Sequence, residues 1–182
     1  SVRVAIGEID APLQEAAPYQ IGNSYLKMAE EALARAAKTR IEEQREVYLA
    51  EAREKLEGAA EFFIVAEEGA SSPALQALAR SQAVVCWYKM KDYERTIDGA
   101  RLLLERYPES KQAEKAMYDI GWAYYDMEDY SNSIEAFKAL IERFGTGYRS
   151  NRALFQLGEA FFTLERYTEA IPYYQRLVDQ QR

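Results

Sequence analysis

Glu114–Arg143, EKAMYDIGWAYYDMEDYSNSIEAFKALIER, is the stretch of sequence that decides the fold. Small and apolar residues recur at helical spacing on one face of a first helix, at Met117, Ile120, Gly121 and Tyr124. A second helix carries a face of the same kind, at Ser133, Phe137 and Leu140. Met-Glu-Asp-Tyr at 127–130 predicts a turn between them, so the stretch is typical of a helical hairpin.

The same pattern recurs 37 residues downstream and 37 residues upstream. The downstream copy has its matching residues at Leu154, Leu157, Gly158, Phe161, Ala170, Tyr174 and Leu177. The upstream copy has them at Ala83, Val84, Trp87, Thr96 and Leu103, and it ends at Pro108. Two equal steps that preserve residue size and polarity indicate a repeat protein built from helical hairpins.

The composition argues against several classes of protein. The 182 residues carry a net charge of −7, which argues against general attraction to nucleic acid or to an anionic membrane. No apolar run approaches the roughly 20 residues needed to span a bilayer. Cys86 is the single cysteine, so no disulfide can form within the chain. The chain begins at Ser1 without a methionine, and we expect it to be an excised or processed segment.

The first part of the chain predicts a hairpin that is longer than the others. Residues 1–12 are short and mixed, and they are either the end of a preceding repeat or a loose terminus. From Pro12 the pattern is helical as far as Ala37. Tyr19–Met28 aligns with Phe155–Leu164, which makes this first helix a repeat helix as well.

Residues 29–68 contain one glycine and no proline, and they are rich in strong helix formers. We therefore expect a bend at Lys38-Thr39 and a single second helix over residues 40–68. The 37-residue step would instead place a turn at residues 52–55, where no turn residue stands. A nine-helix chain that splits at that point is the alternative.

Clear stop and start signals follow. Gly69 and the Ser-Ser-Pro at 71–73 separate the long hairpin, residues 12–68, from three repeats at 74–108, 111–145 and 149–182. The expected helices of these repeats are 74–90 and 93–107, 111–127 and 130–144, and 149–164 and 167–181. The last helix is expected to run to Arg182 without a capping helix, so the segment is expected to come from a longer array.

These residues resemble the tetratricopeptide repeat, whose pattern is Leu, Gly and Tyr on the first helix and then Ala, Phe and Pro. Gly121, Tyr124 and Phe137 carry the resemblance in one copy, and Gly158, Phe161 and Ala170 in the next. The copy at 77–108 departs from the pattern at Arg80 and Val84 but keeps Pro108. The resemblance covers about residues 15–182. It implies an all-α, right-handed α-solenoid of antiparallel helix hairpins, a single array across the chain.

The 37-residue step and the linker Arg-Tyr-Pro-Glu-Ser at 106–110 are similar to a bacterial envelope subgroup of this family. That subgroup includes the Tol–Pal coordinator and the outer-membrane-assembly lipoprotein. This resemblance implies the periplasm or the outer membrane rather than the cytoplasm, and a place in an envelope assembly.

The sequence offers little for catalysis. The chain has no histidine, which excludes histidine-based triads, and its one cysteine is too few for the usual zinc sites. Gly145-Thr146-Gly147 is too short for a phosphate-binding loop. Gly121 and Gly158 are expected in the core, where two helices approach closely, and Cys86 is expected to be a buried thiol. We expect no enzyme, no cofactor and no metal.

A binding groove is the more promising site. In the family the first helix of each hairpin lines a concave groove that holds a peptide. The matching residues here are Tyr19, Asn23, Lys27, Tyr88, Lys89, Lys115, Tyr118, Trp122, Tyr125, Arg152, Phe155 and Phe162, joined by Leu26, Leu78, Ser81, Val85, Asp126 and Glu159. Asn23 and Lys27 alone match the clamp that chaperone-tail binders place on a terminal carboxylate, so we do not expect that clamp.

The expected groove carries four basic residues and two acidic ones, a net charge of +2 within an acidic chain. Its chemistry favours a protein or peptide segment with aromatic or aliphatic anchors and some acidic residues. The alternative for each aromatic residue is packing between neighbouring repeats, without a role in binding.

Three classes of function stay open at this point. The first is a non-catalytic scaffold that binds a protein or peptide. The second is a self-assembly module whose ends stack on other copies. The third is a regulatory arm of an enzyme that lies outside this segment.

Overall fold

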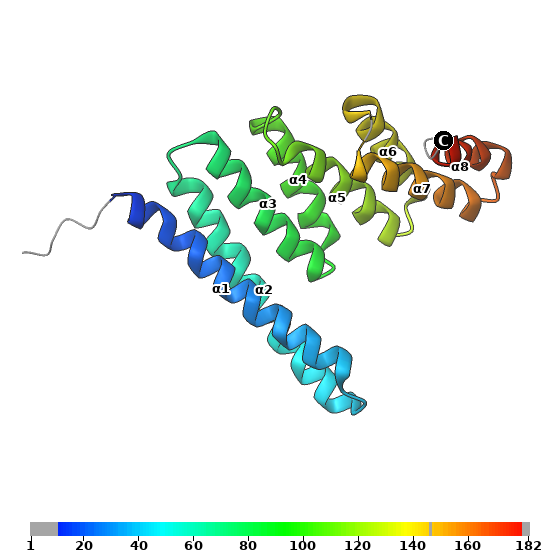
Figure 1. Ribbon diagram of the computed structural model, residues 1–182. Coiled ribbons are helices and arrows are strands. Elements are labelled where there is room, and N and C mark those ends of the chain that lie inside the picture. Colours follow the sequence, from blue (N-terminus) through cyan, green and yellow to red (C-terminus); the bar gives the residue numbers. More distant parts are fainter. Residues whose placement is uncertain (1–10, 146, 180–182) are drawn as a thin grey trace, which may run out of the picture. The chain divides into compact units, whose positions relative to one another are not determined.

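A computed structural model describes residues 11–145 and 147–179, and these residues form eight α-helices and no strand. The helices are α1 (Ala11–Lys38), α2 (Glu42–Gly69), α3 (Pro73–Lys89), α4 (Tyr93–Arg106), α5 (Ala113–Asp126), α6 (Tyr130–Phe144), α7 (Tyr148–Thr163) and α8 (Tyr167–Asp179). They follow one another as hairpins (Figure 1), and the fold is an all-α repeat solenoid. The expectations for residues 1–10, Thr146 and 180–182 lie outside the described residues.

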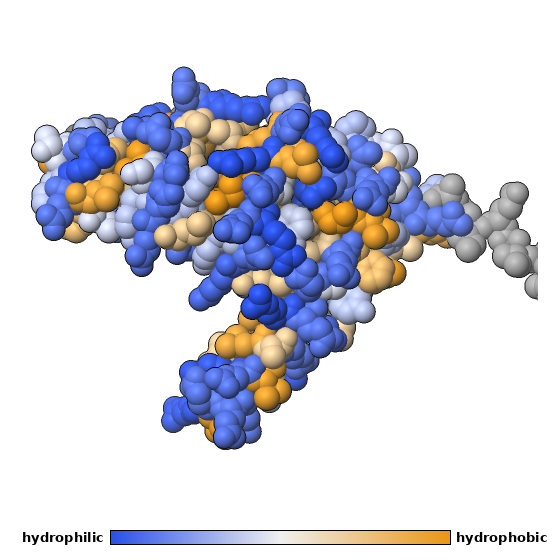
Figure 2. Space-filling model, turned by 180° about the vertical axis from the view of Figure 1, so that it is seen from behind, coloured by the Kyte–Doolittle hydropathy of each residue, from blue (hydrophilic) through white to orange (hydrophobic). Residues whose placement is uncertain are grey.

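The chain divides into two compact units, residues 1–86 and 87–182, with the boundary inside α3. In the first unit α1 and α2 are 28 residues each and run side by side in opposite directions (Figure 1). α2 is continuous from Glu42 to Gly69, so the single-helix interpretation is confirmed and the nine-helix alternative is wrong. The far end of this hairpin exposes several apolar side chains (Figure 2), namely Ile41, Val47 and Leu49.

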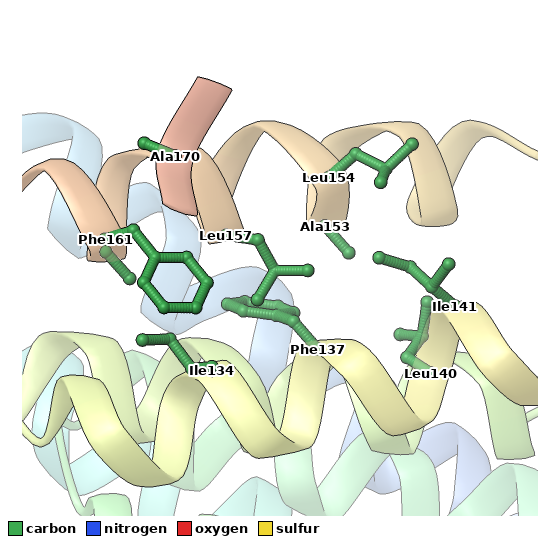
Figure 3. Close-up of a cluster of buried hydrophobic side chains, with 10 residues drawn as sticks. Ile134, Phe137, Leu140, Ile141, Ala153, Leu154, Leu157, Phe161 and Ala170 are labelled. Carbon is green, nitrogen blue, oxygen red and sulfur yellow. The ribbon is translucent and has the colours of Figure 1, made fainter. Parts of the chain in front are cut away.

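The second unit builds its core from consecutive helices. α4 packs on α5, α5 on α6, α6 on α7 and α7 on α8. One buried cluster lies between α6, α7 and α8 (Figure 3), and it consists of Ile134, Phe137, Leu140, Ile141, Ala153, Leu154, Leu157, Ala160, Phe161 and Ala170. α5, α6 and α7 therefore each bury one face against the partner in the hairpin and another against a neighbouring repeat.

The two glycines expected in the core have the predicted role. A Cβ on Gly121 would lie 2.5 Å from the buried ring of Phe137, and a Cβ on Gly158 would collide with Tyr174. Ser133 donates a hydrogen bond of 2.9 Å from its hydroxyl to the Gly121 carbonyl oxygen, across the same hairpin. Cys86 is buried, as predicted. Small residues thus set the distance between paired helices.

The turns of the second unit repeat one geometry. Lys91, Glu128 and Glu165 lie 37 residues apart, and each has a φ near +60°. At Glu128 the amide donates to the Tyr125 carbonyl, and the next amide, of Asp129, donates to Tyr124. These two hydrogen bonds together form the Schellman motif, in which a residue in the left-handed conformation ends the helix. The sequence has no glycine at these three places, where glycine is the usual residue.

We predict that Gly121→Ala destabilises the second unit by about 1–3 kcal/mol, because the new methyl group must displace the buried Phe137 ring. Urea unfolding followed by circular dichroism measures the change. Gly69→Ala is the matched control, since a Cβ there meets nothing within 4 Å. Phe137→Leu combined with Gly121→Ala should cost less than the sum of the single changes; full additivity would contradict the contact.

We predict that Glu128→Gly stabilises the chain by up to about 1 kcal/mol. The left-handed conformation costs a residue with a side chain about 1–2 kcal/mol, and glycine avoids this cost. Part of the stabilisation is offset, because glycine has more conformational freedom in the unfolded chain. Glu165→Gly should behave alike, because its φ is 59°. Glu128→Val should be destabilising. An unfolding midpoint that is lower for Glu128→Gly than for the parent chain would be inconsistent with this.

Candidate functional site

The expected groove residues fall in both units of the chain. In the first unit the Tyr19 ring meets the edge of Phe63, and its hydroxyl accepts a hydrogen bond of 3.4 Å from Gln82. Lys27 is exposed and pairs with Glu30 at 3.1 Å. Asn23 is half-buried. Leu26 is buried, so it belongs to the core and not to an open surface.

A hollow of about 470 Å³ lies beside Tyr19 at the start of α1. Its lining is mostly apolar and comes from three helices and one turn: Pro12, Glu15, Ala16, Tyr19, Gln20, Ala66, Ala70, Ser71, Leu75, Leu78 and Ala79. The Glu15 carboxylate accepts hydrogen bonds from the amide and the hydroxyl of Ser71, at 2.7 and 2.9 Å. This pair fixes the beginning of α1 to the turn between α2 and α3.

In the second unit the aromatic residues of α5 form a continuous series of ring contacts. Trp122 lies edge-on to Tyr118, Tyr125 and Phe137, with ring centroids 5.6–6.2 Å apart. All three α5 rings are half-buried and pack against the core cluster. Each ring therefore has both a packing role and an open side, so packing and binding are compatible for these residues.

Tyr88 and Asp126 form a polar pair at the end of α3 and α5. The Tyr88 hydroxyl donates to the Asp126 carboxylate at 2.6 Å. Burial raises the pKa of Tyr88 well above its ordinary value of 10.0, and the hydrogen bond to Asp126 raises it further. Tyr88 is thus held as a neutral donor, and Asp126 is engaged by a phenol.

Lys115 differs from the expectation of a free positive charge. It forms a close ion pair with Asp119, one helical turn along α5. Burial raises the pKa of Asp119, while Lys115 and Arg149 act in the opposite direction. Asp119 lines a small hollow of about 230 Å³ with Tyr88, Tyr118 and Trp122. The α5 part of the groove is therefore close to charge balance, and the expected net positive charge is reduced.

Arg152 has a different environment. Its Nε donates to the Tyr118 hydroxyl at 3.0 Å, and its Nη1 donates to the Tyr148 hydroxyl at 3.1 Å. Both partners are neutral phenols, and no carboxylate contacts Arg152 among residues 11–145 and 147–179. The guanidinium also lies 5.7 Å from the centre of the Tyr148 ring. It is a cation that is held in place but not neutralised.

A hollow of about 440 Å³ opens beside this guanidinium. Its lining residues are Tyr148, Asn151, Arg152, Phe155 and Gln156. The Phe155 ring is exposed, whereas the Gln156 side chain is buried. The Asn151 Oδ1 atom is buried and has no hydrogen-bond partner in the part of the chain that the structure describes. An exposed ring, two carboxamides and a cation are thus gathered on one face of α7.

The remaining two predicted residues lie apart from this hollow. Phe162 is exposed near the end of α7 and contacts the Tyr167 ring at the start of α8. Lys89 is exposed at the end of α3. Four residues of the site were absent from the sequence-based set, and they are Asp119, Tyr148, Asn151 and Gln156. For two of them the sequence held a signal that was not used: Asp119 follows Lys115, and Tyr148 precedes Arg152, by four residues, the spacing of neighbours on a helix face.

Two family models match the chain, and both describe the tetratricopeptide repeat. One matches residues 78–110 and the other residues 118–182, together more than half of the chain. This chain is a tetratricopeptide-repeat protein. Repeats of this family generally mediate protein–protein interactions, and the family is generally non-catalytic. No curated protein matches this repeat protein significantly.

Solved structures share the fold of this repeat protein at low sequence identity. BtubC (BKLC) from P. vanneervenii has a TM-score of 0.60 and 10% identity, over 94% of this chain and 74% of its own. The putative kinesin light chain repeats of Podosopora anserina have a TM-score of 0.57 and 12% identity, covering 96% of this chain and 97% of that one. The MamA protein has a TM-score of 0.51 and 14% identity, covering 89% and 92%. Among the described residues no helix is long and apolar enough to cross a membrane.

We predict that Tyr88 ionises well above pH 10, and that folding stability falls as the pH rises through that range. The folded state favours the protonated phenol, so its contribution is complete below pH 10 and is lost as the pH approaches the raised pKa. A difference titration at 295 nm between the parent chain and Tyr88→Phe isolates this group. Asp126→Asn should lower the pKa of Tyr88; an unchanged difference titration in that variant would rule out the proposed cause.

Proposed function

We propose that the chain is a non-catalytic scaffold that binds a segment of a partner protein on the α5 and α7 faces of its second unit, with Arg152 pairing a carboxylate of that segment. The single observation that supports this most directly is the environment of Arg152. Its two hydrogen bonds go to phenols, so the positive charge is oriented but not neutralised by the chain itself. Charge-assisted hydrogen bonds to a carboxylate are stronger than those to neutral groups.

The surroundings of Arg152 support a peptide rather than a lone anion. The exposed Phe155 ring offers an apolar contact on one side of the hollow, and Tyr148 offers a second ring. The Asn151 and Gln156 side chains complete the polar part of the lining. A segment with one acidic group and an aromatic or aliphatic anchor fits all these features.

The α5 residues are the proposed continuation of this surface. Tyr118 belongs to both parts, because its hydroxyl holds Arg152 while its ring contacts Trp122. Tyr88, Trp122 and Asp119 line the neighbouring hollow. Lys115 is neutralised by Asp119, so we propose a smaller role for it than for Arg152.

An envelope assembly is the finer form of this proposal. It is supported by the 37-residue step and by the linker Arg-Tyr-Pro-Glu-Ser, both of which are features of the sequence. Detection of the protein in the periplasmic or outer-membrane fraction of its source cell would test this location. A purely cytoplasmic signal would contradict it.

We predict that peptides selected from a random display library on the parent chain contain an acidic group beside an aromatic or aliphatic residue. Arg152→Gln should weaken binding of such a peptide at least about tenfold, because it removes the pairing charge. Phe155→Ala should weaken it by a comparable factor. Arg176→Gln, on the exposed surface of α8, is the matched control and should bind normally. Fluorescence anisotropy of the labelled peptide measures each affinity.

Selected peptides that bind Arg152→Gln and Phe155→Ala as tightly as the parent chain would disprove the site. Circular dichroism of each variant separates lost binding from lost structure. Trp122→Ala with Tyr125→Ala should also weaken binding, but the Trp122 ring packs on Phe137, so that variant should lose stability as well. If the Trp122→Ala, Tyr125→Ala variant unfolds while Arg152→Gln and Phe155→Ala leave peptide binding unchanged, the α5 rings have a packing role alone.

A further inference from the structure

The hollow of about 470 Å³ beside Tyr19 has no part in the site proposed above. All of its lining residues belong to the first unit, and we call it the Tyr19 hollow. One wall comes from the beginning of α1 and another from the beginning of α3, and Ala66 and Ala70 at the end of α2 complete the lining. The beginning of α1 and the turn from α2 to α3 lie at the same end of the long hairpin (Figure 1).

The Tyr19 hollow occupies a place in the repeat that is also open on other first helices. Tyr19-Gln20 on α1 aligns with Phe155-Gln156 on α7, and both pairs line a hollow. One period before α7, the same two places on α5 are Tyr118-Asp119, which line the hollow of about 230 Å³. α5 has both α4 and α6 packed against it. Hollows at this place therefore arise from the repeat itself.

Small side chains make the Tyr19 hollow larger and less polar than the other two. Ala16 on α1 stands where α5 has Lys115 and α7 has Arg152, so a methyl group replaces the long cation of the other first helices. The other small residues of the lining are Ala66, Ala70, Ser71 and Ala79. The space that they leave lies within the range of ligand pockets, about 300–1,000 Å³.

Three polar contacts at this hollow are made within the chain. The Glu15 carboxylate accepts two hydrogen bonds from the turn between α2 and α3. The Gln76 carboxamide donates to the Ala70 carbonyl oxygen at 3.0 Å, and the Gln82 carboxamide donates to the Tyr19 hydroxyl at 3.4 Å. No described residue of the lining is a lysine or an arginine. A charged occupant would lose its water without gaining a partner, so the lining favours an uncharged apolar group.

We propose that the Tyr19 hollow binds an uncharged apolar side chain of leucine, methionine or phenylalanine from a partner protein. The exposed residues of the lining are Pro12, Ala16, Gln20, Ser71 and Leu75. An occupant therefore keeps one side at the surface, as a side chain attached to a main chain does, whereas sites for free small molecules bury about 70–90% of the ligand. This site lies in the first unit and needs no acidic group, so it is independent of the site at Arg152.

Peptide selection on a chain with a disabled Arg152 site tests this proposal. A random display library is selected on the full chain carrying Arg152→Gln and Phe155→Ala, which is the background chain. We expect the recovered peptides to share a leucine, methionine or phenylalanine residue and to need no acidic one. Replacing the shared residue by aspartate should weaken binding at least about tenfold, whereas added salt should change the affinity little, because no charge pair is involved.

Ala16→Phe in the background chain fills the hollow and should weaken binding of the selected peptides at least about tenfold. Ala17→Phe is the matched control, because Ala17 is the next residue of α1, is also exposed and lies outside the lining. It should bind like the background chain. Leu75→Glu is a second variant at the exposed edge of the lining and should also weaken binding. Circular dichroism should show the same helix content in all of these chains.

The proposal would be overturned if the peptides bound the Ala16→Phe chain as tightly as the background chain. Equal losses in Ala16→Phe and Ala17→Phe, or a selection that yields no peptide sensitive to Ala16→Phe, would overturn it as well. If N-acetyl-leucine amide binds as tightly as the selected peptides, the hollow is a pocket for a free small molecule and not a docking site. None of these results affects the Arg152 site, whose peptides are selected on the parent chain.

Discussion

The structure depends on the absence of a side chain at Gly121. The Phe137 ring occupies the space that a Cβ would need, so α5 and α6 pack closer than larger residues at their crossing would allow. Gly158 and Tyr174 repeat the arrangement, and so do Gly22 and Phe63 in the long hairpin. The remaining hairpin has Val84 and Ala100 at these two places, so the small and the large residue are exchanged in its sequence. The repeat therefore requires one small and one large residue at each crossing of paired helices, and the identity of those residues matters less than their volume.

The close helix pairs also determine which side chains meet at the candidate site. When hairpins stack at a constant spacing, residues one repeat apart come into contact. Tyr88 with Asp126, Glu114 with Arg149, and Tyr118 with Arg152 are such pairs. The site is therefore a product of the repeat itself, because its polar contacts join equivalent faces of neighbouring first helices.

The fold was predictable from the sequence because it depends on two simple quantities, period and volume. The 37-residue step identified the hairpins, and the absence of proline in residues 29–68 identified α2 as one helix. Pro18 and Pro172 lie inside helices, where local preference alone would have ended them, so packing outweighs the missing backbone hydrogen bond.

The charges of the site were less predictable, because they depend on side-chain direction rather than on pattern. The sequence counted Lys115 as a free cation, whereas it pairs with Asp119. Tyr148 was assigned to the segment before the helix, yet α7 begins at that residue and places the phenol one turn from Arg152. A shift of one residue at a helix end was thus enough to remove a contact from the expected site.

The two arginines at the start of α7 show why the candidate site centres on one of them. Arg149 pairs with Glu114 at 3.2 Å, so its charge is already compensated by the chain. Arg152, one turn later, receives only neutral oxygens, and a guanidinium has five N–H donors to satisfy. Beside it lies a buried amide oxygen of Asn151 without a partner in the described chain, a condition that costs about 1–3 kcal/mol. We therefore place the carboxylate of the proposed segment at Arg152, where it would supply the charged acceptor that the chain itself does not.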